Sequence, residues 1–247
     1  MLLMSDRPLA VVVLAAGQGT RMKSSRAKVL HELSGVPMIG HVMATANALR
    51  PDYVLVVVKH QKEAVSLAAS QYCSDALFVD QDEVGGTGRA LEMALDSLPA
   101  NFFGDVCVVS GDVPLLDSDT MIAARRHQLK EGAAATLLSA VVSDPTGYGR
   151  IIRGQSGLVI RVVEDKDASN DEVAVTEVNS GAYLFDAKTV RNALPKVKLR
   201  NSQGEKYLTD VVEIITREKG KVHAIQVEDS WLLEGINDRL QLAQSQL

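Results

Sequence analysis

Two glycines and a group of basic residues occupy the stretch 17–28, directly after an apolar run. Gly17 and Gly19 allow the backbone to turn sharply and to bring its N–H groups close to an anion. Arg21 can bind a phosphate through two parallel hydrogen bonds, and Lys28 can add a positive charge. These residue types predict a phosphate-binding loop, and a glycine turn with solvated charges is the alternative that they leave open.

Two common phosphate-binding motifs do not fit this loop. A dinucleotide-binding loop needs a third glycine where Met22 stands, and it needs an acidic residue after the second strand, where Lys59 and His60 stand instead. A P-loop needs glycines, a lysine and a hydroxyl residue at a spacing that residues 17–24 do not have. A different class of phosphate site is therefore expected.

The elements that would position this loop follow from the apolar pattern of the first half. Short apolar runs alternate there with helical patterns, which predicts βαβ units and a mostly parallel sheet. Right-handed crossovers would place the loops that follow the strands along one sheet edge, where α/β folds bind ligands. The expected strands are 9–14, 53–58, 76–79 and 105–109, and the expected helices are 37–49, 61–72 and 88–98.

The second half has a different pattern, in which strand-like runs are separated by Gly and Asp/Asn turns. This predicts antiparallel additions to the sheet at 134–142, 150–153, 158–163 and 180–185. A helix over 207–219, a strand over 221–227 and a tail helix over 237–247 are expected to follow. No repeat or Pro/Gly-rich linker divides the chain, so we expect one α/β domain with a mostly parallel mixed sheet and helices on both faces.

Composition limits the partners of this domain. The net charge of −5 argues against non-specific binding to nucleic acid or to a membrane surface, so an anion site should be local. The longest apolar run, 9–16, is much shorter than the ~20 residues of a membrane-spanning helix. Cys73 and Cys107 lack metal-ligand spacing, which favours reduced thiols and a cytoplasmic location.

The complete loop motif, L-A-A-G-x-G-T-R-M with Lys28 eleven residues after the first glycine, resembles the signature of the sugar-phosphate nucleotidyltransferases. Further segments resemble that family in the same order, and within it the combination is most similar to the uridylyltransferases that make UDP-N-acetylglucosamine. These segments are AKVLHELSGVPMIGHV (27–42), VDQDEVGGTGRAL (79–91), VVSGDVPLL (108–116), DPTGYGRI (144–151), VVEDKDA (162–168), EVNSGAYLF (177–185), KYLTD (206–210) and EGINDRLQL (234–242).

The resemblance implies a Rossmann-like nucleotidyltransferase fold and a specific reaction. UTP and N-acetylglucosamine-1-phosphate would give UDP-N-acetylglucosamine, a cell-wall precursor, and pyrophosphate. The sugar-phosphate oxygen that attacks the α-phosphorus of UTP is already ionised at neutral pH, so no general base is needed. We therefore expect no catalytic His or Ser, and we expect catalysis to rest on positioning and charge neutralisation.

The resemblance also assigns residues to the nucleotide. Arg21 and Lys28 would hold the triphosphate as the catalytic residues, and Gln81 would read the uracil through an amide that can donate and accept. Without the resemblance, Gln81 would be interpreted as an ordinary loop amide. The other residues expected at the nucleotide are Leu14, Ala15, Ala16, Gly17, Gly86, Thr87, Ser110 and Gly111.

A metal site and a sugar site are implied in the same way. Asp112 follows a strand, where a carboxylate is either a turn residue or a metal ligand, and the resemblance makes it a Mg²⁺ ligand together with Asn237. Both residues would also contact substrate. Gly149, Glu164 and Asn179 would contact the sugar, whereas position alone suggests a hairpin turn for the first and turn or strand-end polarity for the other two.

The sequence departs from the usual enzyme of this type in one respect. That enzyme is commonly bifunctional, and its second half is a β-helix of hexapeptide repeats that acetylates glucosamine-1-phosphate. No such array occurs in these residues, so we expect a uridylyltransferase domain over 1–236 and a helix over 237–247 that would lead to the absent domain. A truncated enzyme and a stand-alone domain both remain open, as does a homo-oligomer, which would be a trimer where the β-helix exists.

Two other functions remain as alternatives. A related enzyme could use another sugar or nucleotide, against which Gln81 and the segment 144–151 argue. A non-catalytic regulatory relative would have lost catalytic residues, whereas Arg21, Lys28, Asp112 and Asn237 are all present.

Overall fold

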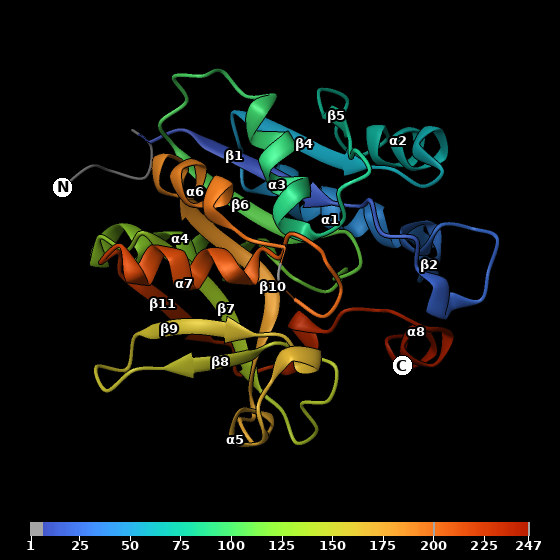
Figure 1. The fold of residues 1–247 in the computed structure, drawn as a ribbon. Coiled ribbons are helices and arrows are strands. Elements are labelled where there is room, and N and C mark those ends of the chain that lie inside the picture. Colours follow the sequence, from blue (N-terminus) through green and yellow to red (C-terminus); the bar gives the residue numbers. More distant parts are fainter. Residues whose placement is uncertain (1–6, 200, 247) are drawn as a thin grey trace.

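A computed structural model of the chain describes residues 7–199 and 201–246. Within them, nine strands form one sheet, whose main path runs β11-β7-β10-β6-β1-β4-β5 (Figure 1). The central strand β1 (Leu9–Leu14) pairs in parallel with both β4 (Tyr53–Val58) and β6 (Asp105–Ser110), and β4 pairs in parallel with β5 (Leu77–Asp80). This part of the sheet confirms the predicted βαβ organisation.

The second half of the chain extends the sheet through one reversed strand. β10 (Glu177–Asp186) runs antiparallel to β6 on one side and to β7 (Ala135–Val141) on the other, and β11 (Val222–Gln226) is parallel to β7. The expectation of antiparallel additions is confirmed by the pairing of β10 with β6 and with β7, and β7 consequently runs in the same direction as β6. This shared direction could not be predicted because β10, a later segment, inserts between them.

β10 is also longer than expected and is irregular. Its pairing with β7 shifts between Asn179 and Tyr183, and Gly181 within this interval has a φ of +79°. A glycine tolerates this conformation at low cost, so it accommodates the bulge. β8 (Arg150–Arg153) and β9 (Val159–Val163), both expected as antiparallel additions, form an antiparallel hairpin, and this hairpin joins β10 through the pair Val178–Arg150.

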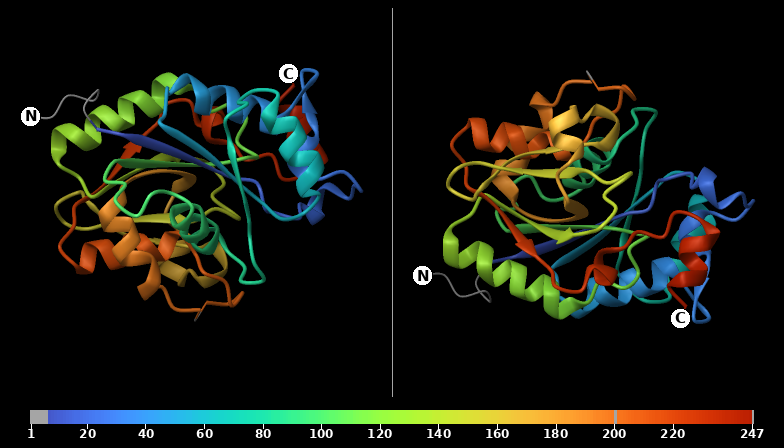
Figure 2. Two further views of the ribbon diagram at one scale, coloured as in Figure 1. Left: turned by 90° about the horizontal axis from the view of Figure 1, so that it is seen from above. Right: turned by 90° about the horizontal axis from the view of Figure 1, so that it is seen from below.

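Helices cover both faces of the sheet, as Figure 2 shows. One buried cluster lies between the sheet and α1 (Met38–Ala48), α2 (Lys62–Ser70) and α4 (Ser118–Glu131). The other lies between the sheet and α3 (Thr87–Asp96), α6 (Ala187–Ala193) and α7 (Thr209–Arg217). Shorter elements are η2 (Thr20–Met22), η3 (Lys28–Leu30), β2 (Glu32–Leu33), β3 (Val36–Pro37), η4 (Asp165–Asp167), α5 (Asn170–Val173), η5 (Leu194–Lys196), η6 (Ser230–Leu233) and α8 (Arg239–Gln244).

The helix α4 has no counterpart among the elements expected from the pattern. Its buried face includes Arg125 and Gln128, so its hydrophobic periodicity is weak. Arg125 is tolerated there because its Nε donates to Asp105 Oδ2 at 2.8 Å. Local signals nevertheless mark both ends, since the side chain of Asp117 accepts a hydrogen bond from Thr120 N and Gly132 closes the helix at a φ of +60°.

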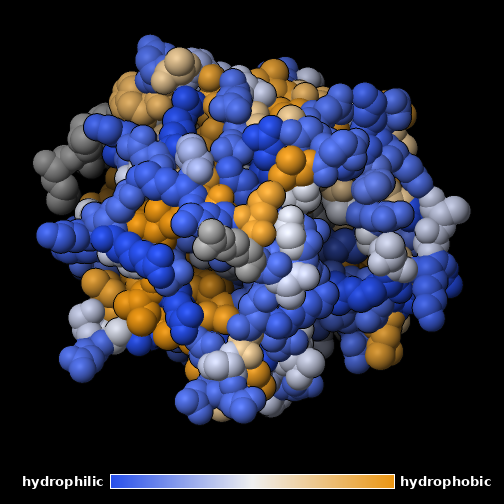
Figure 3. Space-filling view, viewed as in Figure 1, coloured by the Kyte–Doolittle hydropathy of each residue, from blue (hydrophilic) through white to orange (hydrophobic). Residues whose placement is uncertain are grey.

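Three features of the structure bear on the expectations from composition: the polarity of the surface, the length of the apolar helices and the state of the cysteines. Hydrophilic residues cover most of the face in Figure 3, and hydrophobic ones gather near α7 and β9. Within the described ranges, no helix is both long enough and apolar enough to span a membrane. Cys107 is buried and Cys73 is half-buried, and both are free thiols among these residues.

Candidate functional site

Two adjoining cavities open at the ends of the parallel strands, on the edge where the sequence predicts the functional loops. The first has a volume of about 450 Å³ and the second about 290 Å³. Four residues line both cavities, which makes them the junction: Leu14, Thr87, Ser110 and Asp112.

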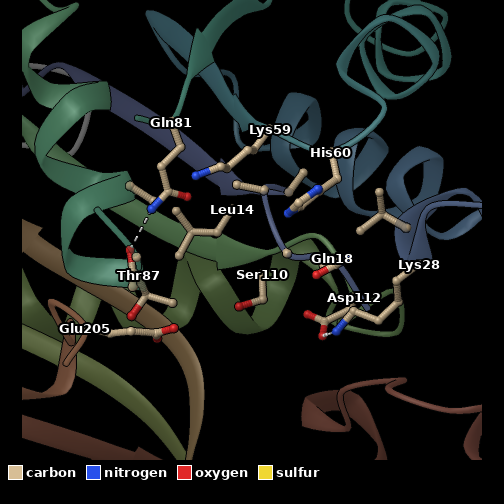
Figure 4. Close-up of a pocket in the computed structure, with 17 residues that line it drawn as sticks. Leu14, Gln18, Lys28, Lys59, His60, Gln81, Thr87, Ser110, Asp112 and Glu205 are labelled. Atoms are coloured by element: carbon tan, nitrogen blue, oxygen red, sulfur yellow. Dashed lines mark hydrogen bonds and ion pairs between the residues drawn. The ribbon is translucent and has the colours of Figure 1, made fainter. Parts of the chain in front are cut away.

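The first cavity contains most of the residues expected at the nucleotide. Its walls come from the ends of β1, β4, β5 and β6 and from the start of α3 (Figure 4). In that view Gln81 and Thr87 lie on one side, and Lys28 and Asp112 lie on the other. The expected residues that line it are Leu14, Ala15, Ala16, Gly17, Lys28, Gln81, Gly86, Thr87, Ser110 and Asp112.

The side chain of Gln81 has a fixed orientation. Its Nε2 donates to the carbonyls of Val84 and Gly86, both at 3.1 Å. The amide oxygen has no donor among the described residues and points toward the cavity in Figure 4. The cavity thus presents a hydrogen-bond acceptor at this point, because the loop itself uses the donor end of the amide.

The turn that begins α3 is built around a glycine. Gly86 has a φ of +106°, and a Cβ at this position would lie 2.3 Å from the carbonyl oxygen of Lys206. That same oxygen accepts a hydrogen bond from Gly88 N at 2.8 Å, and Leu208 N donates to Thr87 Oγ1 at 3.1 Å. The turn therefore packs directly against residues 205–208, and only glycine leaves room for this approach.

At the opposite end of the first cavity, four side chains form a polar network. Lys28 Nζ contacts Asp112 Oδ2 and donates to Asn237 Oδ1 at 2.9 Å, while Arg21 Nη2 donates to the same Asn237 oxygen at 2.8 Å. The pairs are separated by 84, 209 and 216 residues in the chain. The structure thus brings together Arg21, Lys28, Asp112 and Asn237, all expected at the phosphates or the metal.

This network also tests whether the residues suit a metal ion. The carboxylate of Asp112 and the amide oxygen of Asn237 converge on one cation, the Lys28 ammonium, so they are placed to share a positive charge. Among the described residues, no group of three or more His, Cys, Asp or Glu could hold a metal. A site with one carboxylate and one amide oxygen suits Mg²⁺, which commonly takes one or two carboxylates and completes its coordination with water and substrate phosphates.

The second cavity contains the residues expected at the sugar. Gly149, Glu164 and Asn179 line it together with Arg21 and Asn237. Asn179 N donates to Gly149 O at 2.8 Å, which joins two of these segments. A Cβ at Gly149 would lie 3.6 Å from Glu164 Oε2, so the three residues occupy one small region.

The carboxylates near this cavity are electrostatically crowded. Burial raises the pKa of Glu164, and the charges of Asp167 and Asp165 raise it further, against the opposing hydrogen bond from Thr209 Oγ1 at 2.9 Å. Burial, with the charge of Glu164, raises the pKa of Asp210 to about 6. The second cavity and its surroundings therefore contain carboxylates whose protonation is sensitive to pH.

Gly111 is the expected site residue that lines neither cavity. Its N–H donates to the carbonyl of Leu14 at 2.9 Å, and a Cβ there would lie 3.2 Å from that oxygen and from Val29 Cγ1. It joins the loop after β6 to the end of β1, so its contribution to the site is indirect.

Several residues that line the cavities were not expected from the sequence. Gln18, Lys59, His60 and Glu205 line the first, and Lys59 and His60 lie directly after β4, at the edge already expected to bind a ligand. That position was a usable signal, although the sequence analysis expects no catalytic histidine. Tyr148, Tyr183 and Thr209 line the second cavity.

Comparison with known proteins identifies relatives of this chain. Residues 11–206 match the model of the MobA-like NTP transferase domain. The chain is 50% identical over 237 residues to the bifunctional protein GlmU of Clavibacter sepedonicus, which covers 95% of this chain and 48% of that protein. It is also 50% identical over 245 residues to the GlmU of Leifsonia xyli subsp. xyli, which covers 98% and 50%. The chain thus spans about half the length of the curated relatives that it matches.

Two solved structures share the fold at low identity. UDP-glucose pyrophosphorylase complexed with UDP-glucose has a TM-score of 0.74 at 14% identity, with 97% of both chains covered. The 4-diphosphocytidyl-2C-methyl-D-erythritol synthase of Anaerococcus prevotii has a TM-score of 0.67 at 14% identity, again with 97% of both chains covered. Since the family model covers most of its length, this chain belongs to the MobA-like NTP transferase family.

Proposed function

We propose that this chain transfers the uridylyl group of UTP to N-acetylglucosamine-1-phosphate and produces UDP-N-acetylglucosamine and pyrophosphate. The observation that carries the proposal is the Arg21–Lys28–Asp112–Asn237 network at the junction of two cavities. A cavity for each substrate with cationic groups between them is what transfer between two phosphate compounds requires. The 50% identity to two GlmU proteins supports this choice within the family.

The chemistry needs little from the protein beyond placement and charge. An oxygen of the sugar phosphate attacks the α-phosphorus of UTP in line, a P–O bond forms, and the bond between the α-phosphorus and the bridging oxygen breaks. The attacking oxygen is already ionised, so no side chain has to remove a proton. Arg21 and Lys28 neutralise charge on the phosphates, an electrostatic effect that is often the largest contribution to catalysis.

The free oxygen of Gln81 supports the preference for uracil. The N3 position of uracil carries a proton that this oxygen can accept, whereas N3 of cytosine carries a lone pair that would repel it. Because both amide donor contacts are made to Val84 and Gly86, the side chain would not rotate to suit cytosine without losing them. Leaving such a polar group unpaired is a strong means of rejecting a wrong ligand.

Mg²⁺ is the cofactor that we propose, with Asp112 and Asn237 as its protein ligands. When bound, the ion would neutralise phosphate charge and would help to fix the two substrates relative to each other. The Lys28 ammonium, which contacts both of these side chains, is then available to pair with a phosphate.

On the sugar side, we propose that Glu164 and Asn179, which line the second cavity, hydrogen-bond to hydroxyl or amide groups of the acceptor. Soluble nucleotide and sugar-phosphate substrates also support a cytoplasmic location.

The experiment that tests the proposal measures pyrophosphate release by the purified chain. UTP with N-acetylglucosamine-1-phosphate and Mg²⁺ should give release, and omission of the sugar phosphate should abolish it. CTP, ATP and dTTP in place of UTP, and glucose-1-phosphate in place of the acceptor, test the related enzymes. Faster turnover with another pair of substrates would replace this assignment, and no turnover with any pair would favour a non-catalytic relative.

A further inference from the structure

The short C-terminal helix α8 lies against the loop that carries Arg21, and Figure 2 shows the C-terminal end of the chain beside this early segment. Arg239, the first residue of α8, donates from Nε to the carbonyl of Met22 and from Nη2 to the carbonyl of Lys23, both at 3.0 Å. These carbonyls are at the end of η2, where a helix leaves its acceptors unsatisfied. Arg239 therefore supplies hydrogen-bond donors to these two carbonyls of the loop.

The loop needs such support because its own conformation is costly. Gly19 before η2 and Lys23 after it both have left-handed backbone conformations, with φ of 65° and 47°. The second is unfavourable because Lys23 has a Cβ, which a left-handed backbone brings too close to the following carbonyl oxygen. Two main-chain hydrogen bonds hold the turn, from Met22 N to Gly19 O at 3.0 Å and from Lys23 N to Thr20 O at 3.1 Å. Arg239 adds two bonds from outside the loop.

The same helix also fixes the partner of Arg21. Gln241 in α8 accepts a hydrogen bond from Asn237 N at 2.7 Å, and its own N–H donates to the helix cap Asp238 at 2.9 Å. Asn237 Oδ1 then accepts from Arg21 Nη2 at 2.8 Å. The helix therefore contacts both sides of the Arg21–Asn237 pair, one through Gln241 and the other through Arg239.

We propose that Arg239 is a positioning residue, which holds the loop over 19–23 in the conformation that presents Arg21 to the triphosphate. The proposal rests on the proposed function, because it requires that Arg21 binds UTP. Arg239 itself lines neither cavity, so it acts through the loop. When the competent conformation is only partly populated, the apparent affinity falls by the same fraction, and saturating ligand restores the full population.

The chain offers a matched control for this test. Arg191 also donates from one guanidinium to two main-chain carbonyls, those of Leu95 at 2.9 Å and Pro99 at 3.3 Å. It belongs to α6 and lines neither cavity. Arg191→Ala therefore removes the same kind of contact elsewhere, and Arg239→Lys keeps the charge but not the planar group that reaches both carbonyls.

The first measurement is hydrogen exchange of the Met22 and Lys23 amides in the ligand-free protein. Exchange should become about tenfold faster in Arg239→Ala, since the loss of two hydrogen bonds has an effect of that order. The second measurement is steady-state kinetics, in which KM for UTP should rise about tenfold while kcat stays within about twofold. Arg239→Lys should fall between wild type and Arg239→Ala, and Arg191→Ala should change neither quantity.

Each of the other results has a definite meaning. Unchanged exchange at both amides, or faster exchange with an unchanged KM, would overturn the positioning role. A lower kcat with an unchanged KM would also overturn it, because this indicates a loss of active protein and not an open loop. Faster exchange together with an inactive wild-type protein would instead overturn the proposed function, and Arg239 would hold a loop with another purpose.

Discussion

The two cavities differ in the residues that form their walls. Small residues at the end of β1 and at the start of α3, among them Ala16, Gly17 and Gly86, line the first cavity together with the cationic side chains of Lys28 and Lys59. The second has acidic and amide side chains from segments of the second half, among them Glu164 and Asn179. We therefore expect the first cavity to bind through backbone shape and positive charge, and the second through acidic and amide side chains.

The largest effect is expected at the junction, which both cavities share. Asp112→Ala should reduce kcat/KM by about 10²–10³, the scale on which loss of one charge-stabilising group acts. The thermal unfolding temperature should change little, because Asp112 lies in the loop after β6 and neither it nor Lys28 belongs to the buried apolar clusters.

The measurement for this variant is turnover during a Mg²⁺ titration, with Asp112→Asn as the isosteric control. Both variants should need far more Mg²⁺ than the wild type. A wild-type Mg²⁺ dependence in Asp112→Ala would show that this residue does not hold the metal.

A substitution at a glycine of the first cavity should destabilise the turn that begins α3. Gly86→Ala would place a Cβ 2.3 Å from the Lys206 carbonyl and should cost about 2–3 kcal/mol of unfolding free energy because a packed segment must move. Gly157→Ala is the control, since Gly157 also has a positive φ but has no atom within 4 Å of the added Cβ.

The control should cost only about 1–2 kcal/mol, the cost of the left-handed backbone. Chemical denaturation measures both costs. Equal costs in the two variants would mean that the close approach to residues 205–208 does not constrain the turn.

The base specificity of the first cavity should depend on one side chain. Gln81→Ala should lower the preference for UTP over CTP by about 1–3 kcal/mol, because it removes the acceptor that distinguishes N3 of the two bases. The ratio of the kcat/KM values for UTP and CTP measures this preference. If kcat/KM falls by the same factor for both nucleotides, Gln81 shapes the loop through Val84 and Gly86 and does not read the base.

The smallest effect concerns the charges on the sugar side. The pKa of Asp210 is raised from an ordinary value of 3.8 to about 6, so the folded state binds its proton more tightly than the unfolded state. The stabilising contribution of this carboxyl is therefore complete below the unfolded pKa and is lost as the pH rises through about 6.

Asp210→Asn removes the titrating carboxyl and therefore the loss of stability that accompanies its ionisation as the pH rises. Relative to wild type, the variant should gain about 1 kcal/mol of unfolding free energy at about pH 7.5, after allowance for solvent screening of a partly exposed group. The gain should shrink toward zero at about pH 4. Denaturation at the two pH values measures it, and a gain that does not vary with pH would contradict the raised pKa.

Much of the fold could be predicted because its signals are local. β1 is buried along nearly its whole length, which its continuous apolar sequence indicates directly. The direction of β7 relative to β6 could not be predicted, since it depends on β10 inserting between them. The helix α4 was missed because Arg125 faces the core, where a distant carboxylate, Asp105, neutralises it.

The sequence by itself determined the phosphate-binding character of residues 17–28 and the parallel half of the sheet, because both depend on neighbouring residues. Only the tertiary structure decided that Arg21 and Lys28 meet Asn237, more than 200 residues away, and that Arg239 supports the loop between them. It also decided which end of the Gln81 amide faces the cavity. Such contacts have no local signature, because they form only when the packing of the sheet and its helices has brought the segments together.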